Sequence, residues 1–179
     1  MSYDVSSLFT NVPLEETIEI LADKAFTNNW FNTTYNLNLT RTDLVDLLSV
    51  ATKGQLFQFS GALYEQTDGV AMGSPLGPLL ANVFMSSIEE SLEREGKLPS
   101  FYRRYVDDTL TVMADVASAT DFLDTLNNAH SSVKFMMEIE SNGMLPFLGI
   151  QLFNRSPRVE TKVYIKPRIQ GYSCIIRVM

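Results

Sequence analysis

The chain has 179 residues, of which 45 % are hydrophobic, and its mean hydropathy is close to zero. These values exclude a disordered chain and favour one globular domain with a sizeable core. No segment approaches the roughly 18 consecutive apolar residues of a membrane span, and the N-terminus lacks the pattern of a secretory signal. The net charge of −7 argues against a bulk nucleic-acid binder, because such domains usually carry a basic stripe.

The single cysteine, Cys174, cannot form an internal disulfide. This pattern indicates a reducing, intracellular compartment. The excess of acidic over basic residues remains compatible with a cluster of carboxylates that is neutralised by bound metal.

The first segments predict a strand, a helix and a connection. Residues 3–9 are β-prone and lead to Pro13, which suits the first turn of a helix. That helix ends near Phe26, and its apolar face is formed by Leu14, Ile18, Leu21, Ala22 and Ala25. The Asn-rich segment 27–39 is aperiodic and predicts a surface connection.

A second helix and a hairpin are expected next. Thr40 and Asp43 resemble a capping box, and Gly54 ends the helix. Its expected apolar face is formed by Leu44, Leu47, Leu48 and Ala51. The runs LFQF and ALYEQ predict two strands, joined by the two-residue turn Ser60-Gly61.

A glycine-rich segment, residues 69–77, opens a long helix. Ser74 can cap this helix and Pro75 suits its first position, whereas Gly96 and Pro99 come after its end. Apolar residues recur every four positions, at Leu76, Leu80, Phe84, Ile88 and Leu92.

The stretch YVDD, residues 105–108, is flanked by apolar and aromatic residues and predicts a strand, a tight turn and a second strand. Two adjacent carboxylates repel each other unless a cation lies between them, and hard oxygen ligands suit Mg²⁺. The alternative is an ordinary turn, because Asp tolerates turn geometry and bonds its own backbone. The turn alone does not decide between the two interpretations.

The last third predicts a helix and several strands. Ser118 and Asp121 indicate a capping box for a helix that ends near His130, with an apolar stripe that includes Phe122 and Leu126. Strands are expected in the runs KFMMEIE, LPFLGIQLF and VETKVYIK, with a turn at Asn142-Gly143.

This order predicts an α+β fold in which helices cover one face of an antiparallel sheet, with a split β-α-β-β-α-β layout. In that layout the first strand, with Asp4, can lie beside the hairpin that carries Asp107 and Asp108. Three carboxylates would then supply ligands for two divalent ions, which in phosphoryl transfer lie roughly 3.5 to 4 Å apart. Gly69 to Gly77 would let the backbone approach a base or sugar closely.

Four blocks of the chain, in order, resemble the palm of a reverse transcriptase, most closely that of the Penelope-like retroelements. SYDVSSLFTNVP resembles the first catalytic block, GVAMGSPLGPLLANVFM the nucleotide and template block, and YVDD the second catalytic block. KFMMEIE with LPFLGIQL resembles the last blocks of the palm, and KVYIKP resembles the family segment beyond those blocks. The resemblance covers about residues 2–168. We expect residues 1–168 to form the palm domain, whereas residues 169–179 resemble nothing in the family.

The resemblance implies a metal site and a nucleotide site. Asp4 and Asp107 would ligate both metal ions, Asp108 would be the third carboxylate, and the Val5 carbonyl would complete a metal shell. The residues implied for the incoming nucleotide are Phe9, Met72, Gly73, Ser74 and Pro75.

Two of these nucleotide-site residues leave alternatives open. Phe9 lies where the family places the residue that blocks a 2′-hydroxyl, but it could equally be a core aromatic at a strand end. Met72 stands where many reverse transcriptases have Gln, so apolar packing replaces a hydrogen bond there.

Other positions are implied to contact the primer or to donate a proton. Tyr105 and residues 147–149, which are Phe147, Leu148 and Gly149, correspond to primer contacts. Lys134 resembles a candidate proton donor to pyrophosphate, with a solvated lysine as the alternative. Arg103 and Arg104 could meet primer phosphate or be solvated edge residues.

The implied function is RNA-directed DNA synthesis with two Mg²⁺ ions, or Mn²⁺ in their place, on an RNA template, a DNA primer and dNTPs. We expect no membrane partner and a nuclear location, and we predict no oligomeric state. Fingers before Asp4 and a thumb are expected to be missing, so the alternative is a non-catalytic remnant that binds nucleic acid or a partner. A third possibility is an RNA-dependent RNA polymerase, for which Phe9 is a poor choice because ribonucleotides must enter.

Overall fold

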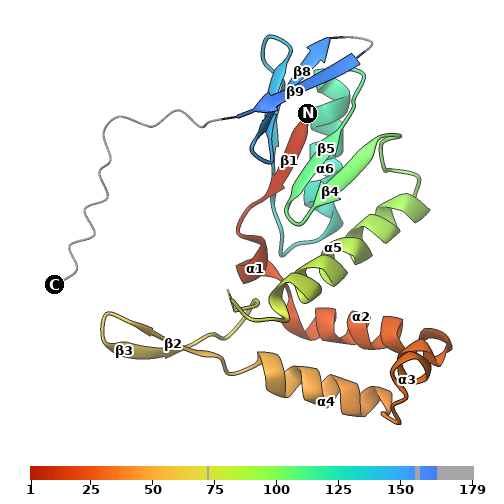
Figure 1. Ribbon diagram of the computed structural model, residues 1–179, viewed down its shortest axis with the longest axis vertical. Helices are drawn as coiled ribbons and strands as arrows, with labels where there is room; N and C mark the ends of the chain where they lie inside the picture. The colour runs from red at the N-terminus through yellow and green to blue at the C-terminus, as the bar shows by residue number, and fades with distance from the viewer. Residues whose placement is uncertain (72, 156–157, 165–179) are drawn as a thin grey trace. The chain divides into compact units, whose positions relative to one another are not determined.

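The computed structural model describes residues 1–71, 73–155 and 158–164 (Figure 1). The chain divides into two compact units, Met1–Glu138 and Ile139–Met179. Residues 169–179, for which the sequence shows no family resemblance, lie outside the described residues. No helix in the described part of the chain is both long and apolar enough to cross a membrane.

The first unit is built on a four-stranded antiparallel sheet. Its strands, in the order β4-β5-β1-β6, are β4 (Tyr102–Tyr105), β5 (Asp108–Thr111), β1 (Ser2–Val5) and β6 (Phe135–Glu138). The N-terminal strand is therefore central, between the second strand of the YVDD hairpin and β6. This is the predicted arrangement, and it brings residue 4 next to residue 108.

One face of this sheet is covered by helices α5 (Gly77–Arg94) and α6 (Val116–Ala129). Tyr3 on β1 is buried, packs edge-on against Phe122 of α6 and donates its hydroxyl to the Ala119 carbonyl. Arg104 on β4 donates a hydrogen bond to the Glu89 carboxylate of α5. Because side chains alternate along a strand, Asp4 and Asp108 point to the opposite face. The predicted α+β fold with helices on one face is thus confirmed.

The remaining helices of the first unit are α1 (Leu8–Asn11), α2 (Leu14–Phe26), α3 (Trp30–Tyr35) and α4 (Arg41–Thr52), with a 3₁₀ turn at Thr27–Asn29. Helix α2 lies between α4 and α5 (Figure 1). The hairpin of β2 (Leu56–Phe59) and β3 (Ala62–Glu65) comes after α4 and turns at Ser60-Gly61, as predicted. The predicted capping box of Thr40 and Asp43 is also confirmed.

Two predictions for the N-terminal part were wrong. The first strand ends at Val5 rather than Phe9, because Ser7 adopts a left-handed conformation (φ 52°) from which α1 begins. Segment 27–39 lies at the surface as predicted, but the irregular structure expected for it was wrong, since it contains the 3₁₀ turn and α3, where the rings of Trp30, Phe31 and Tyr35 pack together.

Helix positions differ from prediction at three places. Helix α5 begins at Gly77 rather than Pro75, and Ser74 instead accepts a bond from the Leu76 amide in the preceding turn. Asp115 caps α6, three residues before the predicted Ser118. On α4, Leu47 was predicted to lie on the apolar face but is exposed. The apolar residues of α4 that contact the core are Leu44, Val45 and Leu48.

The second unit contains a three-stranded antiparallel sheet of β7 (Met144–Phe147), β8 (Ile150–Arg155) and β9 (Arg158–Val163). The predicted turn at Asn142-Gly143 is present, with positive φ at both residues. The run LPFLGIQLF is two strands rather than one, because Leu148 (φ 48°) and Gly149 (φ 75°) form a tight turn inside it.

Candidate active site

The three aspartates of the predicted metal site occupy one end of the sheet in the first unit. Asp4 on β1 pairs directly with Asp108 on β5. Asp107 lies in the adjoining turn, and its carbonyl accepts a hydrogen bond of 3.3 Å from the Val5 amide. Residues about a hundred positions apart in the chain are thus brought together on the face away from the helices.

These carboxylates repel one another. The pKa of Asp4 is raised, first by burial and then by the charge of Asp107, against a lowering hydrogen bond from the Val5 backbone. The pKa of Asp108 is raised by burial and by the charges of Asp107 and Asp4. Partial burial beside like charges disfavours the ionised form and makes a cation at this position favourable.

The donor set fits a hard divalent cation in its chemistry, because it consists of carboxylate oxygens. Within residues 1–71, 73–155 and 158–164, however, no three His, Cys, Asp or Glu side chains form a ready metal-ligand cluster. The three aspartates thus share one end of the sheet but do not form such a cluster in this arrangement. The Val5 backbone, implied as a metal ligand through its carbonyl, is joined to Asp107 through its amide.

The turn that carries Asp107 is strained. Val106 has a φ of 57°, which a β-branched residue rarely adopts. Such conformations cost about 1 to 3 kcal/mol and persist only where the surroundings enforce them. Here the Val106 carbonyl accepts a hydrogen bond from the guanidinium of Arg104.

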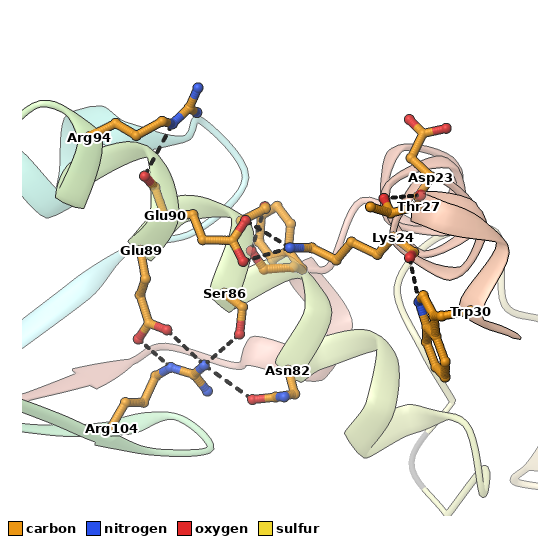
Figure 2. Close-up of polar contacts among 12 residues, drawn as sticks. Asp23, Lys24, Thr27, Trp30, Asn82, Ser86, Glu89, Glu90, Arg94 and Arg104 are labelled. Atoms are coloured by element: carbon orange, nitrogen blue, oxygen red, sulfur yellow. Dashed lines mark hydrogen bonds and ion pairs between the residues drawn. The ribbon is translucent and has the colours of Figure 1, made fainter. Parts of the chain in front are cut away.

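Arg104 is not a solvated edge residue or a primer contact, as sequence reasoning suggested. Its side chain is 8 % exposed, because it points to the helix-covered face and pairs with Glu89 (Figure 2). Arg103, one position earlier, is exposed and lies over the Phe101 ring. The alternation of the strand explains why two adjacent arginines have opposite environments.

The glycine-rich segment packs directly on the chain around Phe9. The Val70 amide donates to the Phe9 carbonyl at 2.7 Å. A Cβ on Gly69 (φ 72°) would lie 2.6 Å from the Thr10 carbonyl oxygen, so only glycine fits there. Phe9 is half-buried, packs against the core and faces Gly77 at the start of α5. These contacts support the alternative interpretation of Phe9 as a core aromatic.

A cleft of about 770 Å³ lies next to this contact. It is bounded by the glycine-rich segment, the end of α4 and the base of the β2–β3 hairpin. Three of the implied nucleotide-site residues, Gly73, Ser74 and Pro75, line it, together with Thr10. Met72 lies outside the described residues.

The remaining predicted residues lie in three different places. Tyr105 pairs with Asp108 and is exposed on the same open face of the sheet. The ammonium group of Lys134 donates to the Asn127 carbonyl near the end of α6, which covers the other face. Phe147, Leu148 and Gly149 form the β7–β8 turn of the second unit.

Sequence reasoning missed the network behind the YVDD hairpin. Glu89, Asn82 and Ser86 all accept hydrogen bonds from Arg104 (Figure 2). Glu89 also accepts a hydrogen bond from the Tyr102 hydroxyl. Burial and the charge of Glu89 raise the pKa of Tyr102. The sequence spacing contained a signal for this network: residues 82, 86 and 89 share one face of a helix, and residues 102 and 104 share one face of a strand.

The family model described as "Reverse transcriptase (RNA-dependent DNA polymerase)" matches residues 1–140. The chain belongs to this family. The matched segment of this reverse transcriptase domain contains all three aspartates, Phe9 and the glycine-rich segment. Members of the family are nucleotidyltransferases. No curated protein sequence matches the chain.

Solved telomerase structures have a similar fold. Apo telomerase from Candida tropicalis, truncated from the C-terminal domain, matches with a TM-score of 0.60 and 13 % identity over 90 % of this chain. Telomerase from Candida albicans, in complex with a TWJ fragment of telomeric RNA, matches with a TM-score of 0.61 and 12 % identity over 90 % of this chain. The chain spans 35 % and 30 % of those telomerase chains, respectively. At this identity the likeness concerns the fold.

Proposed function

We propose that the chain provides the catalytic palm for RNA-templated DNA synthesis, in which a primer 3′-hydroxyl attacks the α-phosphate of a dNTP. The observation that carries the proposal is the direct pairing of Asp4 with Asp108, beside Asp107, on the open face of the sheet. The reverse transcriptase family match supports it. Divalent ions bound at the acidic end of the sheet would neutralise its charge and let a chain of net charge −7 act on a polyanionic substrate.

Asp4, Asp107 and Asp108 would hold the divalent ions, Mg²⁺ or Mn²⁺. When bound, the ions neutralise charge on the reacting phosphate and lower the pKa of the attacking hydroxyl. The protein residues hold the carboxylates at one place: the β1–β5 pairing aligns Asp4 with Asp108, and the Val5 amide fixes the Asp107 backbone. Tyr105, which is exposed beside Asp108, would contact the primer end.

The cleft lined by Gly73, Ser74 and Pro75 would receive the nucleotide and template base. Phe9 does not itself line this cleft, but its neighbour Thr10 does, and Phe9 packs against Val70 and Gly77. From there Phe9 would exclude a 2′-hydroxyl by occupying its space. Nucleic acid as partner is supported by the RNA-bound state of the Candida albicans telomerase neighbour. Lys134 is a weaker candidate for the proton donor, because its ammonium group bonds α6.

The test is primer extension with an RNA template, a DNA primer, dNTPs and Mg²⁺. It is run on the 179-residue chain and on the longest natural protein that contains it, because the telomerase neighbours are about three times longer. Extension should be abolished by Asp107→Asn and unaffected by Asp124→Asn, a matched change at an exposed position on α6.

The opposite result supports the non-catalytic alternative. If neither protein extends the primer, or if Asp107→Asn leaves extension unchanged, these aspartates do not catalyse polymerisation. Gel-shift binding of the RNA–DNA duplex by such an inactive protein would then favour a remnant that binds nucleic acid.

We also propose an origin in a Penelope-like retroelement and action in the nucleus. The four ordered motif blocks support the origin, most specifically GVAMGSPLGPLLANVFM and, after it, YVDD. Genomic sequence on both sides of the coding region, translated in all frames, tests it. A retroelement origin requires further retroelement motifs there, and flanking sequence typical of a single-copy host gene would contradict it.

A further inference from the structure

Arg104 links helix α5 to the turn that carries Asp107. Its Nε and Nη2 atoms donate to the two carboxylate oxygens of Glu89, the latter at 3.0 Å (Figure 2). Its Nη1 atom donates to the Val106 carbonyl at 3.1 Å. One planar guanidinium thus contacts a half-buried carboxylate and the Val106–Asp107 turn at the same time, which a lysine ammonium at one point cannot do.

The guanidinium is itself fixed in place. Asn82 and Ser86 accept further hydrogen bonds from Nη2, and all three partners on α5 lie along one helix face. Arg104 and Glu89 are 8 % and 19 % exposed, so solvent screens their interaction little. Helix α5 is in turn anchored in the core by residues such as Leu80 and Phe84. The turn is therefore tied to a rigid element.

The two central residues of the turn are held from opposite sides. Arg104 holds the Val106 carbonyl, and the Val5 amide on β1 holds the Asp107 carbonyl. Val106 is in a left-handed conformation that valine disfavours, so the turn requires external support. Without the Arg104 bond, relaxation of Val106 would shift Asp107 away from Asp4.

We infer that Arg104, oriented by Glu89, is a positioning residue that holds the Val106–Asp107 turn so that Asp107 stays beside Asp4. It does not touch the reacting groups. Its importance for catalysis rests on the proposed function, whereas its effect on the turn does not. A small displacement of a catalytic group is enough to lower a rate strongly, because catalysis depends on near-attack geometry.

Hydrogen exchange at two adjacent backbone amides reports on the turn and can be measured in an inactive protein. The Val5 amide donates to Asp107 in the turn, and the Ser6 amide donates to Lys134 at the other neighbouring strand. Their hydrogen exchange, measured residue by residue by NMR, separates movement of the turn from general loosening of β1. In Arg104→Lys, exchange at Val5 should accelerate at least tenfold relative to exchange at Ser6.

Tyr102→Phe is the matched control. It removes a hydrogen bond to the same Glu89 oxygen but leaves the contact with Val106 intact. Exchange at Val5 relative to Ser6 should stay unchanged in this variant, even if its unfolding midpoint falls. If Arg104→Lys does not fold, Glu89→Gln is used in its place, because this change weakens the hydrogen bonds that hold Arg104 but keeps the guanidinium. Glu89→Gln should also accelerate exchange at Val5.

The outcomes are distinct. Unchanged relative exchange at Val5 in the folded Arg104 or Glu89 variant overturns the inference, and so does equal acceleration in Tyr102→Phe. In an active protein, Arg104→Lys should lower kcat at least tenfold with little change in the KM for dNTP, since the nucleotide cleft is untouched. If Val5 responds as expected but Asp107→Asn leaves extension unchanged, the proposed function fails and the positioning of the turn stands.

Discussion

Asp4 and Asp108 lie directly opposite each other in the antiparallel pairing of β1 and β5, and the pKa values of both are raised. The main cause is burial, and the charge of Asp107 comes second. In the absence of a cation, this end of the sheet is destabilising at neutral pH. Protein stability should therefore respond to pH, to substitution and to divalent ions in a defined way.

The first prediction concerns pH. Between the ordinary aspartate pKa of 3.8 and the raised pKa of Asp108, the folded state binds more protons than the unfolded state. The free energy of unfolding therefore falls as pH rises through this window. Asp108→Asn should raise the unfolding midpoint at pH 7 and change it little at pH 3, measured by thermal denaturation without divalent ions.

Asp124→Asn is the control for this measurement, because Asp124 is exposed on α6. It should change the midpoint equally little at both pH values. A destabilising effect of Asp108→Asn at pH 7 would show that Asp108 makes favourable interactions that outweigh the repulsion.

The second prediction concerns metal binding. Mg²⁺ or Mn²⁺ should stabilise the folded chain at pH 7, because it binds the aspartates only when they are brought together. At ten times the dissociation constant the gain is about 1.4 kcal/mol. Calorimetric unfolding with increasing MnCl₂ measures it. Asp107→Asn should remove most of the gain, and an equal gain in that variant would place the ion elsewhere.

The third prediction concerns the glycine-rich segment. Gly69→Ala should destabilise the chain through an unfavourable φ of 72° and through a clash of the new Cβ with the Thr10 carbonyl. Gly61→Ala is the matched control, since Gly61 has a φ of 80° but nothing within 4 Å of its Cβ position. We expect a cost of about 1 to 2 kcal/mol for Gly61→Ala, and about 1 to 3 kcal/mol more for Gly69→Ala.

Urea denaturation measures both costs. Equal destabilisation by the two substitutions would show that the chain around Phe9 can move away from the glycine-rich segment. In that case the packing of Phe9 and Thr10 against the glycine-rich segment is looser than the structure indicates.

The fourth prediction concerns sugar selection. Phe9→Ala should let ribonucleotides enter and reduce the preference for a dNTP over its matching rNTP by about tenfold or more, because a steric exclusion is removed. Steady-state single-nucleotide incorporation by an active protein measures the two values of kcat/KM.

Leu8→Ala provides the comparison, because Leu8 is buried next to Phe9 and its truncation lowers stability by about 2 to 5 kcal/mol. It should leave the selectivity ratio unchanged. If Phe9→Ala behaves in the same way, Phe9 is a core residue without a role in selection.

Local sequence determined most of the helices and turns, because their signals lie within a few residues of one another. The capping box of Thr40 and Asp43, the Ser60-Gly61 hairpin and the four-residue apolar repeat of α5 are present as predicted. The YVDD run and the glycine-rich segment also carried the family resemblance. Errors arose where neighbouring residues competed, as when Asp115 rather than Ser118 capped α6.

Tertiary structure alone decided the environment of the turn at Val106 and Asp107. Nothing local distinguishes Arg103 from Arg104, but strand alternation turns one toward solvent and the other toward Glu89, 15 residues earlier in the chain. The direct pairing of Asp4 with Asp108 likewise depends on strand order and register, which arise from long-range packing. The sequence could therefore indicate that these carboxylates repel one another, but the burial that contributes most to the raised pKa values of Asp4 and Asp108 depends on the tertiary structure.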